Sequence, residues 1–302
     1  MTDGPTPDAS PASPPPVPIA VVPPPSAPPP IAAKPAAASP APAPVKPPAP
    51  APPVAATRPP RTGHLQDRGV SRRDSVHALT WVAEGTVKVT GEVDVGNGAV
   101  TGALSVAGPI TADTFGCRGA LDSGGPITVG GTLTTYGSLH GVGPIQAKQA
   151  SFTGTTRIVR EVVVEGSLTV KGHFAAPSLR VAELRGDGAV DVPGSIDAVD
   201  VDVRIRRDSR FGTIRARSVR LIRVPPNPIE WVFGRSPPTP VGRIEAERLE
   251  LEGVDVSFVR CPEVILGREA HVTEIEGTVV RRHSSARVGP RSKSPAPYGL
   301  SR

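Results

Sequence analysis

Aromatic residues are scarce in this chain of 302 residues: Phe, Trp and Tyr together make up 3% of it, and there is one methionine. Ordinary globular cores obtain much of their buried area from aromatic rings, so this composition argues against such a core. Glycine and proline are abundant instead, with 32 and 39 residues. A narrow interior of Val, Ile, Leu and Ala, with glycine at the corners, would explain both features.

Cysteine is also rare, since Cys117 and Cys261 are the only two. They form no CxxC pair, and no histidine stands at ligand spacing from them, which argues against a zinc site. The one apolar stretch near the N-terminus, residues 17–22, is too short for a signal-peptide core and is flanked by proline. We therefore expect both cysteines to be small buried residues rather than partners in a disulfide.

Motifs that carry catalysis are missing as well. No GxxxxGK or GxSxG occurs, and GDGAVDVPG at 186–194 lacks the spacing of a dinucleotide fingerprint. Asp200 and Asp202 alternate with valines, which places them on the solvent face of a strand. His140 and His173 have no convincing acid partner in the sequence and are interpreted as surface residues. We predict no catalytic residue, no metal and no cofactor, and therefore not an enzyme.

A repeat is what the sequence does contain. Ile127, Leu133, Leu139 and Ile145 are six residues apart, with small or polar residues between them. Six is a multiple of the strand period of two, so short apolar-x-apolar strands joined by glycine-containing corners keep one face pointing inward. The spacing slips and recovers along the chain, as it does when extra residues bulge from the corners of a stacked solenoid.

Three such units predict a coil of about 18 residues, with strands stacked at roughly 4.8 Å. The predicted fold class is all-β, a β-helix or β-solenoid over residues 82–222. The predicted core consists of Val87, Val93, Leu104, Ile110, Leu121, Ile127, Leu133, Leu139, Ile145, Leu168, Leu184, Val190 and Ile196.

Composition divides the rest of the chain. Residues 1–60 hold 24 of the 39 prolines and are predicted to be a disordered arm, either a plain spacer or a docking site for a partner. Residues 61–81 are predicted to be a basic junction with room for a short helix. Residues 281–302 are predicted to be a basic disordered tail. The two arms suggest weak contact with anionic lipid or nucleic acid, or simply solubility and spacing.

The repeat is interrupted at 223–242, where five prolines accompany Trp231 and Phe233. This insertion is predicted either to cover an open end or flank of the solenoid or to be a disordered loop. Strand-like alternation returns at 243–280 and predicts additional coils or a cap. Residues expected to contact an end or cap are Trp81, Leu221, Trp231 and Phe233.

Charge is unevenly distributed near this insertion. From Arg204 to Arg223 there are eight arginines and one acid, whereas from Val241 to Glu276 there are nine acids and four arginines. Two interpretations remain open: neighbouring solvated faces that attract each other within one molecule, or complementary patches that act between molecules.

The left-handed hexapeptide-repeat acyltransferases also place an aliphatic residue at every sixth position. Their repeat usually has a small residue or Gly directly after the aliphatic one, where this chain has residues such as Asp122, Thr128 and His140. His140 would be the candidate base in such an enzyme. No long substrate-binding arm is visible, so this interpretation ranks third among the functions considered.

The stretches VKVTGEVDVGNGAVTGALSVAGPITA at 87–112 and VVVEGSLTVKGHF at 162–174 resemble the bactofilins, polymer-forming cytoskeletal proteins. The resemblance covers roughly residues 82–222. It implies a right-handed β-helix that polymerises end to end without nucleotide, with itself as first partner and with envelope or cell-organising proteins as clients. It also implies a cytoplasmic location, with the inner face of the membrane as an alternative.

The physical chemistry of a solenoid agrees with this implication, because each end has unpaired strand edges and an open apolar core that a second end can satisfy. The alternative is a monomeric β-solenoid with both ends capped, whose faces bind a partner. The chain is longer than the resemblance covers after Leu221, and this extension is expected to cap one end and so restrict polymerisation there.

Overall fold

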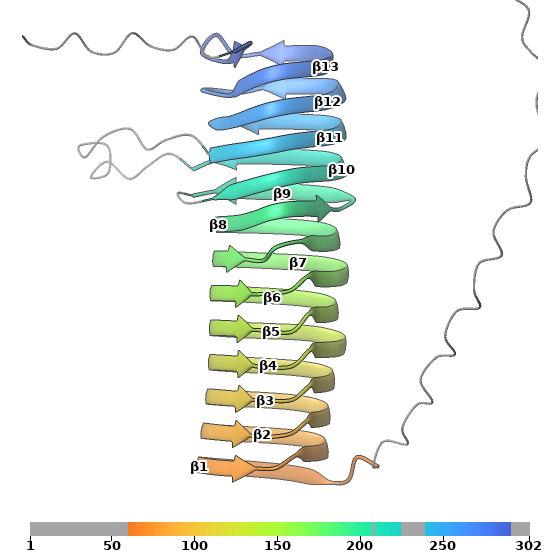
Figure 1. Ribbon diagram of the computed structural model, residues 1–302, viewed down its shortest axis with the longest axis vertical. Coiled ribbons are helices and arrows are strands. Elements are labelled where there is room, and N and C mark those ends of the chain that lie inside the picture. Colours follow the sequence, from red (N-terminus) through yellow and green to blue (C-terminus); the bar gives the residue numbers. More distant parts are fainter. Residues whose placement is uncertain (1–59, 207–208, 225–238, 291–302) are drawn as a thin grey trace, which may run out of the picture. The chain divides into compact units, whose positions relative to one another are not determined.

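The computed structural model describes residues 60–206, 209–224 and 239–290, and they form a single stack of coils (Figure 1). Its sheet has 14 strands, in chain order from β1 to β14, and each strand is parallel to the next. The strands are β1 (His64–Arg73), β2 (Val76–Val89), β3 (Val93–Val106), β4 (Ile110–Ser123), β5 (Ile127–Gly141), β6 (Ile145–Ile158), β7 (Val162–Ala175), β8 (Leu179–Asp197), β9 (Asp200–Ile205), β10 (Arg210–Arg223), β11 (Thr239–Glu252), β12 (Val254–Leu266), β13 (His271–Arg282) and β14 (Arg287–Val288). The predicted all-β solenoid is confirmed.

Each long strand bends at corners, so that one coil contains three short segments with apolar residues inside. In β5 the buried positions alternate within 127–129, 133–135 and 139–141. All thirteen predicted core residues are buried, and each is at most 2% exposed. The apolar-x-apolar pattern therefore identifies the inward face of the strands.

The coil is slightly shorter than 18 residues at most places. Val76 pairs with Val93 and Ile110 pairs with Ile127, which are offsets of 17 residues. The offset becomes 18 where β5 has one more corner residue than β4, between their first and second segments. The strict six-residue spacing at 127–145 is thus a local feature of the coil with the extra residue, and a five-residue spacing at the same corner explains the slips elsewhere.

A column of glycines forms the corner between the second and third segments of the first eight strands. These residues pair in register and have positive φ; they are Gly69, Gly85, Gly102, Gly119, Gly137, Gly154, Gly172 and Gly188. A Cβ atom on Gly119 would lie 2.0 Å from the carbonyl oxygen of Gly102. The corner needs glycine both for its backbone conformation and for the close approach of successive coils.

The few aromatic side chains are distributed so that the narrow interior can hold them. Gly98 lies between Trp81 and Phe115 in the register, and a Cβ atom at Gly98 would be 2.5 Å from the Phe115 ring. Phe152 and Phe174 stack with their ring centroids 5.9 Å apart. Large rings are thus accommodated where the adjacent coil has a residue without a side chain, or where two rings lie parallel.

The solenoid begins earlier than predicted. Residues 64–73 and 76–89 are strands of the first coils, so the interpretation of 61–81 as a junction with a short helix is wrong. The inward positions of β1 are mostly polar, which hid the repeat. The C-terminal boundary also moves, because β13 continues to Arg282 and β14 follows, whereas a disordered tail was predicted from 281.

The insertion near 223–242 does not separate two stacks. β10 and β11 pair directly, with Ile214 opposite Ile244 and Leu221 opposite Leu251. The additional coils predicted for 243–280 therefore continue the same core. The predicted cover by Trp231 and Phe233 lies outside the described residues, as do residues 1–59 of the predicted N-terminal arm and residues 291–302 of the predicted tail.

Candidate functional site

The N-terminal end of the stack is closed by a polar coil. In register, Leu65, Asp67, Ser71 and Arg73 of β1 occupy the positions that Trp81, Ala83, Val87 and Val89 occupy in β2. Three of the four inward positions have thus become polar. Asp67 is 5% exposed, although it belongs to the first coil.

Asp67 is held by two donors. Its Oδ1 accepts from Nη2 of Arg73 at 2.7 Å, and its Oδ2 accepts from Nε1 of the buried Trp81 at 3.0 Å. Burial alone would raise the pKa of Asp67, but the hydrogen bonds from Arg73 and Trp81 outweigh it and leave the pKa below its ordinary value. The carboxylate therefore stays ionised at neutral pH and closes the core with a satisfied ion pair.

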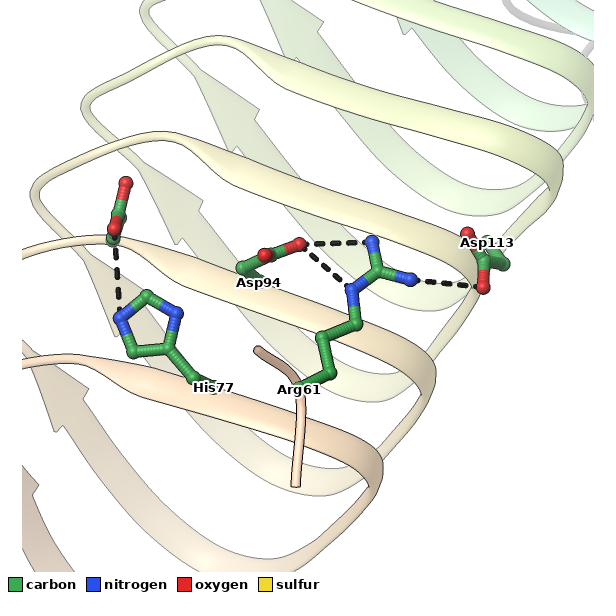
Figure 2. A network of polar contacts seen from close by, with 5 residues as sticks. Arg61, His77, Asp94 and Asp113 are labelled. Carbon is green, nitrogen blue, oxygen red and sulfur yellow. Dashed lines mark hydrogen bonds and ion pairs between the residues drawn. The ribbon is translucent and has the colours of Figure 1, made fainter. Parts of the chain in front are cut away.

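A second polar network ties the chain to the side of the stack just before β1 (Figure 2). Nε and Nη2 of Arg61 donate to Oδ1 of Asp94 at 3.0 and 2.8 Å, and Nη1 donates to Oδ2 of Asp113 at 2.9 Å. Asp94 belongs to β3 and Asp113 to β4, so one arginine spans two coils. Its hydrogen bond to Asp94 raises the pKa of Arg61 above its ordinary value. His77 lies nearby and faces Glu92, with its Nε2 3.5 Å from the carboxylate.

The C-terminal end is more apolar. Ile275 and Val279 of β13 pair in register with the buried Val259 and Val264, and both are partly buried against the core. Val280, the next residue, is 64% exposed. Arg282 occupies the inward position opposite Leu266 and donates through Nε and Nη2 to the carbonyl oxygen of Ala286. Compared with the first coil, this end has one charged residue where the other has two.

The residues predicted to contact an end or cap have different positions. Trp81 lies directly beneath the polar first coil and hydrogen-bonds to it. Leu221 is fully buried in β10 with β11 stacked on it, so its assignment to an end is wrong. The sequence did not identify Asp67, Arg73 or Arg61. A count of coil offsets backward from Trp81 would have aligned Asp67 and Arg73 with the core.

The charged stretches form ion pairs between neighbouring coils. Arg215 of β10 lies 3.3 Å from Glu245 of β11 and 3.5 Å from Asp197 of β8. Arg220 lies 3.2 Å from Glu250, and further along the stack Arg260 lies 3.1 Å from Glu276. The intramolecular interpretation of the charge division is confirmed. These pairs leave little net charge on this side for a distant partner.

The residues considered for catalysis do not form a catalytic site. Asp200 and Asp202 point outward, 3.2 Å from Arg217 and 4.0 Å from Arg220. His140 does have an acid partner, Asp122, whose Oδ1 is 3.1 Å from Nδ1. The statement that it lacks one is therefore wrong, because the two residues are in register 18 positions apart. Both side chains are more than half exposed, and no depression of the surface is found at this pair.

The cysteines are both buried and free, as predicted. Burial raises the pKa of Cys117 to about 11, so its thiol is protonated at neutral pH. Over the described ranges, no three His, Cys, Asp or Glu side chains are grouped so as to hold a metal ion. The same ranges contain no helix with the length and hydropathy needed to cross a membrane.

Comparison of the chain with models of protein families, with curated proteins and with solved structures found no match.

Proposed function

We propose that this protein is a structural scaffold whose solenoids assemble end to end without nucleotide, in the manner that the resemblance to the bactofilins implies. The observation that carries the proposal is that neither end of the sheet is complete. Among the described residues, β1 pairs with β2 alone, and β13 pairs with β14 at His271 and Val272 alone. The remaining backbone donors and acceptors of these two edges are available to another strand.

Both edges also leave side chains incompletely buried. Leu65 at the N-terminal end and Ile275 and Val279 at the C-terminal end are partly buried against the core. Ser71 of the first coil has a buried hydroxyl without a hydrogen-bond partner among the described residues. Contact between ends would complete the burial of the apolar groups and supply a partner for the hydroxyl. On this proposal the scaffold lies in the cytoplasm and holds envelope or cell-organising proteins.

A second candidate is a capped monomeric solenoid that binds a partner on one of its faces. The polar first coil favours it, because the Asp67–Arg73 pair already closes the N-terminal end of the core. If only the C-terminal end associates, the product is a dimer with a self-complementary contact. Monomer, dimer and polymer are therefore separable outcomes.

Sedimentation of the purified full-length chain, without ATP, GTP or metal, tests the proposal. We expect filaments or large oligomers at micromolar concentration. A stable monomer would contradict end-to-end assembly and favour the capped module. A discrete dimer would restrict association to one end.

Matched variants then show which end is used. Val279→Asp should abolish association at the C-terminal end, because it places a carboxylate on the apolar edge, whereas Val280→Asp changes a side chain that is 64% exposed and should have no effect. At the other end, Leu65→Asp is paired with Val70→Asp, whose side chain is 84% exposed. Thermal unfolding followed by circular dichroism confirms that each variant remains folded. Assembly that is unaffected by both Val279→Asp and Leu65→Asp would rule out the ends as the contact.

A further inference from the structure

The last coil of the described chain is attached to the stack through His271. This residue starts β13, is 7% exposed, and lies in register between Asp255 of β12 and Arg287 of β14. Its Nδ1 is 2.7 Å from Oδ1 of Asp255, and its Nε2 is 2.9 Å from the carbonyl oxygen of Gly289. The imidazole thus connects three successive levels of the sheet.

These two contacts determine the proton count. A carbonyl oxygen only accepts hydrogen bonds, so Nε2 of His271 must donate to Gly289. The other contact joins Nδ1 to a carboxyl group, and it needs one more proton, on Nδ1 or on Asp255. A neutral imidazole beside an ionised Asp255 would place a lone pair against an oxygen atom in one of the two contacts. The arrangement therefore requires that the His271–Asp255 pair hold the extra proton.

The attachment of β14 depends on few other interactions. The strand has two residues, and its backbone bonds here are from Arg287 N to Ala270 O at 2.8 Å and from Gly289 N to Val272 O at 2.9 Å. Ala286, which is 1% exposed, packs against the core just before the strand. The carbonyl of Ala286 accepts from Arg282. A lone-pair repulsion at Gly289 acts directly on the last of these bonds.

We propose that the His271–Asp255 pair is a proton-dependent latch, which holds β14 on the solenoid while it is protonated and releases β14 when it loses its proton. Release would uncover Ala270 and Val272 and free the strand edge at 271–273. Resting on the end-to-end function proposed above, the latch would regulate the C-terminal contact, because a longer edge would become available as the pH rises.

Other charged groups near His271 set the conditions for the test. Arg210 lines the same depression of 360 Å³ as Asp255 and His271, and Arg287 is the register partner on β14. His283, in the turn before β14, contacts Ser285 through Nδ1 at 2.9 Å. The arginines do not titrate over the range of interest, which leaves His283 as the second histidine to control for.

Hydrogen–deuterium exchange of the full-length chain at pH 5.5, 7.0 and 8.5 tests the latch, with each rate corrected for intrinsic exchange. Peptides covering 286–289 should lose at least about tenfold in protection between the lowest and highest pH, while a reference peptide covering 127–141 stays unchanged. His271→Gln should remove this dependence, because the glutamine amide does not titrate. His283→Asn should retain it. Equal protection of 286–289 at all three pH values in the wild type would overturn the proposal, as would an unchanged dependence in His271→Gln.

Asp255→Asn provides a second variant if His271→Gln does not fold. Loss of the carboxylate removes the charge that favours the protonated ring, so release should occur at lower pH than in the wild type. Sedimentation at the same pH values separates the latch from the assembly. Release without any change in sedimentation would overturn the regulatory role, whereas a monomer at every pH would contradict the proposed function and leave the exchange result to decide the latch.

Discussion

The coils of β2–β8 and those of β9–β13 bury the same kind of aliphatic core but form their corners differently. In the first region a glycine with positive φ stands at the same corner of every coil, and successive glycines pair in register. This column ends at Gly188, whose partner on β9 is Ile205. Beyond it the chain leaves the regular coil at this corner, between Ile205 and Arg210 and again between Arg223 and Thr239. The glycine column therefore keeps the corner tight, and its loss coincides with longer connections.

The outer faces differ in the same way. Small and uncharged residues dominate the outward positions of the second segment in the first region, where Ala99, Gly116, Thr134, Ser151 and Thr169 follow one another in register. In the second region the corresponding outward positions carry Asp202, Arg220 and Glu250, which form ion pairs between coils. A solenoid core thus tolerates two kinds of surface. The first depends on corner geometry and the second adds electrostatic contacts between coils.

Breaking the shared core should have the largest effect. Leu133→Asp places a carboxylate at a position with 0% exposure, and we expect a loss of several kcal/mol in unfolding free energy, enough to unfold the chain. Thr134→Asp is the control. Thr134 is half-buried on the outer side, so about 1 kcal/mol or less is expected there. Melts followed by circular dichroism measure both, and equal losses would contradict the assignment of Leu133 to the interior.

Disturbing the glycine corner should come next. Gly119→Ala forces an L-residue to φ +128° and brings its Cβ against the Gly102 carbonyl, so a loss of about 3 kcal/mol is expected. Gly116→Ala, three residues earlier in β4, is the matched control, because the nearest atom to its Cβ would be 3.9 Å away. It should change stability by less than about 1 kcal/mol. Chemical denaturation of the two variants decides whether the corner, rather than glycine content, stabilises the first region.

The polar first coil should show itself in acid. The pKa of Asp67 is lowered in the folded protein, so its contribution is present at neutral pH and is lost as the pH falls below about 4. Asp67→Asn should cost about 2 kcal/mol at pH 7 and progressively less as the pH approaches 3. Urea unfolding at several pH values measures this difference. A cost that does not change with pH would mean that the charge of Asp67 is unimportant.

The ion pairs of the second region should have the smallest effect. Arg220 and Glu250 are both almost half exposed, so a double-mutant cycle with alanine should give a coupling of about 0.5 kcal/mol that decreases in 1 M NaCl. Hydrogen exchange in β4–β6 should not respond to the same salt. A coupling that is insensitive to salt would show that packing, not charge, joins these coils.

The sequence predicted much of the fold because the strand period is local. Leu133 and Leu139 identify the inward face from their neighbours alone, and all predicted core positions are buried. The site at the N-terminal end was missed because Asp67, Ser71 and Arg73 are polar residues at inward positions, which alternation cannot distinguish from outward ones. The Asp122–His140 pair was missed because its recognition requires the length of that one coil.

Composition and periodicity by themselves determined the fold class, the identity of the core and the attraction between the basic and acidic stretches. Tertiary structure decided which residues meet between coils. The offset varies between 15 residues, from Val254 back to Thr239, and 18 residues, from Ile145 back to Ile127, because corners gain or lose residues. One residue at a corner changes every later contact, so Arg61 with Asp94, Asp67 with Trp81 and His271 with Gly289 come together only when the coils stack.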